Sequence, residues 1–217
     1  MFAVRYQRPI PYLWSDRDIR RLLEATRALG PPLKAASYET LFGLLAVTGM
    51  RVGEAVALEA DDVDLDTGVI TIREHVAKLE RARLVPLHPT TVQALDRYAR
   101  TRAHICPQAR STTFFVSSIG TRIDRSAVSK TLREITISLG LRTQAVHPRA
   151  HDLRHRFAVS TLIGWQRSGV RIDEQIAVLS SYLGHASPTD TYWYLTATPE
   201  LMGAAARRLD RRFGGRS

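Results

Sequence analysis

Several features that would assign this 217-residue chain to common protein classes are missing from its sequence. Cys106 is its one cysteine, which excludes an intramolecular disulfide framework and a multi-cysteine zinc site. No apolar run reaches the roughly 18 residues that mark a membrane span. The first residues also lack the apolar core of a secretory signal. These absences predict a soluble, cytoplasmic protein with no membrane partner.

Lysine is scarce as well, because only Lys34, Lys78 and Lys130 occur among the 31 basic residues. Acidic residues number 21, so the many arginines give the chain a net charge of +10. A strongly basic protein is expected to bind a polyanion, with nucleic acid as the first candidate. Arginine suits that partner, since its planar guanidinium can bind a phosphate through two hydrogen bonds.

Apolar periodicity predicts a mainly helical protein with a core, to which 44% hydrophobic residues contribute. Ser15 followed by Asp18 resembles a capped helix start, and Gly30-Pro31-Pro32 ends that helix. Ser126 is the expected cap of a later helix. Further helices are expected over about 35–48, 51–58, 89–103, 126–139, 150–166, 173–182 and 189–195. Phe114-Phe115-Val116 is expected to be a short buried segment in the loop-rich stretch 105–125.

Between residues 61 and 88 the apolar pattern changes from helical to strand-like. Short runs near 63–65, 69–72 and 84–87 predict three antiparallel strands, with a tight turn at Asp66-Thr67-Gly68 between the first two. Lys78 would lie at or near the turn before the third strand. The expected fold class is therefore α+β, mainly helical with one small three-stranded antiparallel sheet.

Arg51 lies where the glycine turn Thr48-Gly49 leads into a helix. Backbone amides at the start of a helix, together with a guanidinium, can bind a phosphate. The other interpretation is a structural ion pair, for which Glu54 is the candidate partner.

His151-Asp152-Leu153-Arg154-His155 places His151 and Arg154 on one helical face. The arginine can neutralise a non-bridging phosphate oxygen while the histidine moves a proton. Structural polar contacts would explain the same spacing. His151 and His155 also have the spacing of a metal-binding pair, but the glutamate of the zinc-protease motif is missing and no third ligand is evident. We therefore expect neither a metal nor a cofactor.

Two tyrosines follow, and Tyr194 is the candidate nucleophile. A phenol has an ordinary pKa of about 10, so it needs nearby cations or a base to react. Tyr192 competes for the role, and either ring could simply pack against the protein. His185 could hydrogen-bond a phosphate, and Lys78 could protonate a leaving 5′ oxygen.

The combination closely resembles the active site of the tyrosine recombinases, the phage-integrase family, along the chain from about residue 12 to the end. Thr48 to Ala55 is similar to the first-arginine motif, Lys78 lies eight residues ahead of Pro86 like the β-turn lysine, and His151 to His155 resembles the H-x-L-R-H box. Leu183-Gly184-His185 precedes Tyr194 by the family's usual nine residues, which favours Tyr194 over Tyr192. The matching residues are Arg51, Lys78, His151, Arg154, His185 and Tyr194.

This resemblance implies a site-specific recombinase or integrase in which Tyr194 cuts double-stranded DNA and forms a 3′-phosphotyrosyl link. Arg51 and Arg154 would stabilise the transition state, and Lys78 would be the general acid. His151 would act as acid and base, and His185 as a hydrogen-bond donor to the phosphate. The family also implies a homo-tetramer on DNA, joined through exchange of a C-terminal helix. Residues 199–217 carry the apolar stripe Leu201, Ala205, Leu209 and Phe213.

Integrases usually carry a helical core-binding domain ahead of the catalytic domain, and only about 14 residues precede the first expected helix here. We therefore expect an N-terminal tail over 1–14, a catalytic domain over 15–198 and the exchanged helix over 199–217. One alternative is a truncated, non-catalytic DNA-binding remnant of an integrase. A type IB topoisomerase-like enzyme is a weaker alternative. The expected location is the bacterial cytoplasm, in association with the nucleoid.

Overall fold

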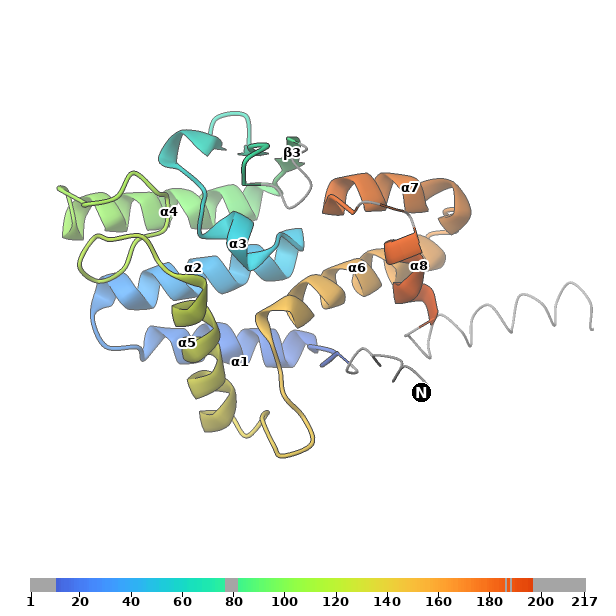
Figure 1. The fold of residues 1–217 in the computed structure, drawn as a ribbon, viewed down its shortest axis with the longest axis horizontal. Coiled ribbons are helices and arrows are strands. Elements are labelled where there is room, and N and C mark those ends of the chain that lie inside the picture. Colours follow the sequence, from blue (N-terminus) through green and yellow to red (C-terminus); the bar gives the residue numbers. More distant parts are fainter. Residues whose placement is uncertain (1–10, 77–81, 186, 188, 197–217) are drawn as a thin grey trace, which may run out of the picture.

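The computed structural model describes residues 11–76, 82–185, 187 and 189–196. Figure 1 shows how its elements are arranged. The helices and strands are α1 (Asp16–Arg27), α2 (Pro32–Thr48), α3 (Val52–Ala55), η1 (Ala60–Asp62), β1 (Val63–Asp64), β2 (Val69–Ile72), β3 (Arg83–Pro86), α4 (Pro89–Ile105), α5 (Arg125–Ser138), α6 (Ala150–Arg167), α7 (Ile172–Leu183) and α8 (Thr189–Thr196). None of the helices within these ranges is long and apolar enough to cross a membrane.

The helix starts follow from capping chemistry. Ser15 caps α1 as predicted, because its Oγ accepts a hydrogen bond from the backbone amide of Asp18 at 3.1 Å and the Asp18 carboxylate accepts one from the amide of Ser15. The prediction that Ser126 caps α5 is wrong. Asp124 is the cap, and its Oδ1 accepts from the amide of Ser126 at 2.6 Å. The second helix begins at Pro32, ahead of the expected start, because proline suits the first position of a helix.

The predicted sheet is confirmed as three antiparallel strands in the order β1-β2-β3. Ile70 pairs with Val63 on one side and with Val85 on the other. Both Ile70 and Ile72 are fully buried, so the central strand presents its apolar face to the core. In the turn before β2, Oδ1 of Asp64 accepts hydrogen bonds from the amides of Asp66 and Thr67 at 3.0 and 2.9 Å. Lys78 lies outside the described residues.

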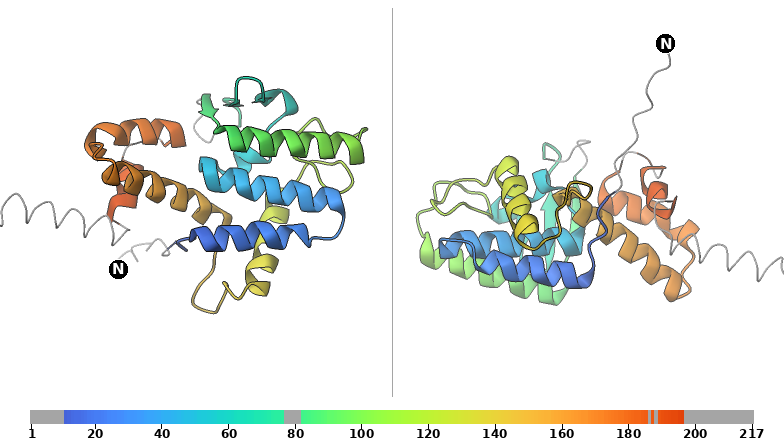
Figure 2. Two further views of the ribbon diagram at one scale, coloured as in Figure 1. Left: turned by 180° about the vertical axis from the view of Figure 1, so that it is seen from behind. Right: turned by 90° about the horizontal axis from the view of Figure 1, so that it is seen from below.

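The core consists of two clusters. The larger one joins α1, α2, α4, α5, the sheet and the predicted buried segment around Phe115. The smaller one comprises Ala158, Val159, Leu162, Leu179, Leu183 and Tyr194. Figures 1 and 2 show the end of α6 gathered with α7 and α8 on one side of the molecule, away from α4. Helix α6 begins in the larger cluster with Leu153 and continues into the smaller one, so it connects the two.

Glycines at positive φ end α2 and α7. Gly49 has a φ of 64° and Gly184 a φ of 65°, conformations that other L residues rarely adopt. A Cβ on Gly49 would also lie 2.6 Å from Cδ1 of Phe157. Both turns reverse the chain directly ahead of predicted site residues, Arg51 and His185.

We predict that Gly49→Ala lowers the free energy of unfolding by at least about 1–2 kcal/mol, because it combines left-handed strain with a clash. Gly164 in α6 is the matched control. A Cβ there meets nothing within 4 Å, and Gly164→Ala should raise stability by about 0.5–1 kcal/mol. Urea unfolding of both variants measures the difference, and equal effects of the two changes would contradict the assigned role of Gly49.

Candidate active site

Arg154 is a buried cation, with 1% of its surface exposed. Its Nη1 donates to the carbonyl of Gly49 at 2.8 Å and its Nη2 to the carbonyl of Leu183 at 2.7 Å. The last carbonyls of a helix lack intrahelical partners and carry partial negative charge. Arg154 therefore ties the end of α2 to the end of α7.

Burial lowers the pKa of Arg154 to about 10, and the charge of Arg51 contributes to the same shift. A pKa of about 10 still keeps the guanidinium protonated at neutral pH. The opposing influence of Tyr194 on this pKa indicates that the tyrosine lies within electrostatic reach of Arg154. A desolvated cation close to a phenol is what a phosphate-handling site requires.

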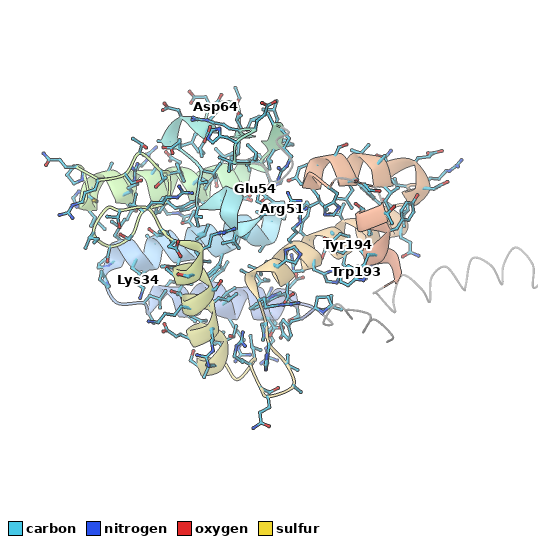
Figure 3. The ribbon with its side chains drawn as sticks, in the orientation of Figure 1. Lys34, Arg51, Glu54, Asp64, Trp193 and Tyr194 are labelled. Carbon is cyan, nitrogen blue, oxygen red and sulfur yellow. The ribbon has the colours of Figure 1, made fainter. Side chains whose placement is uncertain are left out.

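Arg51 binds Gly184, the residue that follows Leu183 at the end of α7. Its Nη2 donates to the carbonyl of Gly184 at 2.7 Å, and its Nη1 donates to Oε1 of Glu54 at 2.9 Å. The Glu54 carboxylate also accepts from the amide of Arg51 at 2.8 Å, which closes the first turn of α3. The pairing of Arg51 with Glu54 is thus confirmed, and Figure 3 shows the two side chains together at the centre of the molecule.

Arg83, at the start of β3, is a part of this arrangement that the sequence patterns did not reveal. Its Nη1 and Nη2 donate to the two oxygens of Glu54 at 3.0 and 2.7 Å, and its Nε donates to the carbonyl of Tyr182 at 2.9 Å. In the sequence, Arg83 is one arginine of an arginine-rich segment. The alternation of a strand was the available signal, because it places Arg83 on the same face as Val85, which is buried.

His151 lies in the first turn of α6 with part of its surface exposed to solvent. Desolvation by its surroundings and the neighbouring charge of Arg154 lower its pKa, while Asp152 opposes the shift. Arg51 also contributes to the lowering, so His151 shares the electrostatic environment of both arginines. A neutral imidazole in this position can accept a proton at neutral pH.

Tyr194 is 4% exposed, whereas Tyr192 is 46% exposed. The Tyr194 ring stacks on the ring of His185, with the two centroids 6.0 Å apart. His185 in turn has its Nδ1 2.7 Å from the hydroxyl of the buried Thr191. The geometry therefore gathers Tyr194 with His185, and Figure 3 shows Tyr194 beside α6.

His155 packs on the other residues of this group, with its ring centroid 5.0 Å from those of both Tyr194 and Trp193. It is 1% exposed, and neither ring nitrogen has a hydrogen-bond partner among the described residues. Desolvation lowers its pKa to about 4, so the ring is neutral at physiological pH.

In the described part of the chain, no group of three or more histidine, cysteine, aspartate and glutamate side chains could hold a metal ion.

A cavity of about 720 Å³ opens beside Arg51. Arg122 and Arg125 line it together with His75, and the carboxylates of Glu54, Glu59 and Asp124 are also in its wall. Arg125 extends across the start of α3, since a Cβ on Gly53 would lie 3.4 Å from its Nη1. Both Arg122 and Arg125 are exposed. The cavity thus offers cationic groups next to a candidate site residue.

The family model described as the phage integrase family matches residues 15–200 of this chain. The chain belongs to the phage integrase family. The integrase/recombinase homologue y4rB of Sinorhizobium fredii is 43% identical over 227 residues, which cover 100% of this chain and 71% of y4rB.

Solved recombinases share the fold of this integrase-family chain. The crystal structure of XerA recombinase has a TM-score of 0.71 and 27% identity, and the match covers 99% of this chain and 68% of XerA. The XerH site-specific recombinase bound to its difH substrate has a TM-score of 0.66 and 23% identity, with coverage of 92% and 54%. This chain therefore spans only part of the length of these proteins, and its fold is that of a recombinase catalytic domain.

Apart from Lys78, the predicted site residues of this family member lie in one neighbourhood. Arg51 and Arg154 bind successive carbonyls at the end of α7, just ahead of His185. The charges of Arg154 and Arg51 both lower the pKa of His151, and Tyr194 acts to raise the pKa of Arg154. His151 and Tyr194 therefore lie within electrostatic reach of the arginines. Their catalytic roles stay predictions, which are developed under the proposed function.

Protonation of His155 should destabilise the folded chain. The pKa of about 4 in the folded state lies below the ordinary value of about 6.5, so the unfolded state binds the extra proton first. Stability is therefore complete above pH 6.5 and declines as the pH falls toward 4, by up to about 3 kcal/mol.

We predict that His155→Phe removes this part of the pH dependence, as measured by urea unfolding between pH 7 and pH 4. The exposed His104 provides the control, and His104→Phe should keep the wild-type slope. Parallel curves for wild type and His155→Phe would show that the buried imidazole does not cause the loss.

Proposed function

We propose that this chain is the catalytic part of a site-specific DNA recombinase or integrase, which cuts and rejoins DNA through a 3′-phosphotyrosyl intermediate. One observation carries the proposal. Two guanidiniums, those of Arg51 and Arg154, bind successive carbonyls of the turn that leads into His185. The ring of Tyr194 then stacks on His185. Two cations, a hydrogen-bonding group and a phenol are therefore assembled around one turn.

In the proposed reaction the phenolic oxygen of Tyr194 attacks the scissile phosphorus. The bond from phosphorus to the 5′ oxygen breaks. The segment that now ends in the 3′-phosphate stays attached to the tyrosine, and the other segment leaves with a free 5′-hydroxyl. The phenolic proton passes to His151, whose lowered pKa suits a base at neutral pH. Lys78 donates a proton to the departing 5′ oxygen. Attack by the 5′-hydroxyl of a second strand on the phosphotyrosine reverses these steps.

Arg51, Arg154 and His185 would stabilise the charge that develops on the non-bridging oxygens. Preformed donors in a desolvated site are effective because they need no reorganisation during the reaction. Cationic side chains would supply the neutralisation that a metal ion supplies elsewhere, so we propose a reaction without a metal requirement. We therefore expect that chelation of divalent ions leaves cleavage unchanged.

The substrate we propose is double-stranded DNA, which agrees with the net charge of +10 and with the DNA substrate bound by XerH. On DNA we propose a homo-tetramer joined through residues 199–217, which lie outside the described residues. The proposed location is the nucleoid in the bacterial cytoplasm.

A nicked suicide duplex tests the nucleophile, because loss of the short strand beyond the nick traps the covalent adduct. The probe is a pool of nicked duplexes with random sequence around the nick. We predict that wild type and Tyr192→Phe form an adduct that migrates slowly on denaturing gels, and that Tyr194→Phe forms none. An adduct that persists in Tyr194→Phe would refute the assignment.

The same experiment separates the alternatives. A chain that binds the duplexes but forms no adduct as wild type would be a non-catalytic DNA-binding protein. A monomer that relaxes supercoiled plasmid without exchanging strands would be a type IB topoisomerase-like enzyme.

The cavity beside Arg51 yields a binding prediction. If Arg125 holds a backbone phosphate there, Arg125→Ala should reduce the slope of log affinity against log salt by about 0.9, the value for one phosphate contact on duplex DNA. Fluorescence anisotropy with a labelled duplex measures the slope. Arg100 is the control, because it lies on α4 and pairs with Asp96 at 3.0 Å. Equal slopes for Arg125→Ala and wild type would exclude this contact.

A further inference from the structure

Two arginines share the carboxylate of Glu54. Arg83 binds both of its oxygens, at 3.0 and 2.7 Å, while Arg51 binds Oε1 alone through its side chain, at 2.9 Å. Glu54 is 1% exposed, so this buried charge depends on its partners. The bidentate geometry makes Arg83 the stronger of the two.

The same two arginines also bind the end of α7. The Nε of Arg83 donates to the carbonyl of Tyr182, and Nη2 of Arg51 donates to the carbonyl of Gly184, two residues further along. A Cβ on Gly184 would lie 3.0 Å from Nη1 of Arg83 and 3.5 Å from Nη1 of Arg51. The two guanidiniums therefore both lie against Gly184.

Charge balance shows what Arg83 contributes. Burial raises the pKa of Glu54, but the hydrogen bonds and charge of Arg83, followed by those of Arg51, lower it below its ordinary value. Glu54 is thus ionised, and Arg83 contributes more to that state than Arg51 does. Arg51, Arg83 and the Glu54 carboxylate together carry a net charge of +1. Because Arg83 satisfies most of the carboxylate, the charge of Arg51 remains available to a phosphate.

We propose that Arg83 is a positioning residue for the strand-cleavage reaction. It would hold Glu54 and the end of α7 so that the guanidinium of Arg51 is both fixed and electrostatically available to the scissile phosphate. This inference rests on the proposed function, since it assumes that Arg51 neutralises a phosphate. Arg83 itself would touch neither the DNA nor the reacting atoms.

A purely structural role for Arg83 would also lower activity, so the test needs a readout that responds to charge at the phosphate. In a methylphosphonate, a methyl group replaces one non-bridging oxygen, and the negative charge that Arg51 would neutralise is absent. The experiment measures single-turnover adduct formation by the full chain on nicked duplexes of the sequence recovered from the random pool. Each duplex carries either a phosphodiester or a methylphosphonate at the scissile position.

We expect Arg83→Met to slow cleavage of the phosphodiester by about 100-fold, the usual effect of losing one preorganised donor. On the methylphosphonate the loss should shrink to less than about tenfold, the same pattern as in Arg51→Met. Arg83→Lys should recover little on the phosphodiester, since an ammonium cannot bind both oxygens of Glu54 in the geometry of a guanidinium.

Arg73→Met is the matched control. Arg73 directly follows β2 and, like Arg83, pairs with a buried carboxylate; its Nε lies 2.5 Å from Oδ1 of Asp62. Any loss in this variant should be equal on the two substrates. Because Arg83→Met leaves Glu54 with one partner fewer, the double variant Glu54→Gln with Arg83→Met removes the buried charge as well. It should be folded by circular dichroism and lose less activity on the phosphodiester than Arg83→Met, because no carboxylate then competes for the charge of Arg51. The remaining loss should still be larger on the phosphodiester than on the methylphosphonate, because Arg51 is no longer held in place.

Equal losses on both substrates, in Arg83→Met or in the folded double variant, would overturn the inference and leave the proposed function standing. If wild type forms no adduct on either substrate, the proposed function falls and the inference falls with it.

Discussion

The buried guanidinium of Arg154 is the interaction on which the rest of the site depends. A charge removed from water needs hydrogen-bond partners, and Arg154 finds them in the carbonyls of Gly49 and Leu183. Gly49 lies two residues before Arg51, and Leu183 lies two residues before His185. A single side chain from α6 thus binds both turns from which Arg51 and His185 extend.

Backbone carbonyls, rather than carboxylates, provide much of the support for the arginines. Arg154 is bound by carbonyls, and Arg51 divides its guanidinium between the carbonyl of Gly184 and the carboxylate of Glu54. A carbonyl orients a guanidinium without cancelling its full charge, so the region stays cationic. This arrangement requires glycine at the helix ends, because the reversal of the chain there needs positive φ.

Local chemistry made much of this structure predictable. The capping of α1 by Ser15, the three strands and the partnership of Arg51 with Glu54 all depend on residues close together in the chain. The sequence pattern gives the wrong answer where two nearby residues can perform the same role. Asp124 and Ser126 can both cap a helix, and only the backbone geometry shows that Asp124 does so.

Long-range contacts were beyond the sequence patterns. Arg83 binds Glu54, which is 29 residues away in the sequence, and Tyr182, which is 99 residues away. Apolar periodicity does not indicate which residues so far apart are in contact. The burial of His155 likewise follows from the packing of α8 on α6, so its spacing from His151 could equally indicate a metal-binding pair or a packed ring. The sequence could indicate which described residues come together, but not the contacts that orient them.

Because the core is divided into two clusters, the site is assembled only while the two clusters are packed together. Tyr194 and Leu183 belong to the smaller cluster, whereas Met50 and Ala55, on either side of Arg51, belong to the larger one. Proteins open locally in cooperative units, and such units often follow the boundaries of packed motifs. Separation of these two clusters would break the hydrogen bonds to Leu183 and Gly184 and dismantle the site while both clusters stay folded. If Tyr194 acts as proposed, its reactivity therefore depends on the docking of the two clusters.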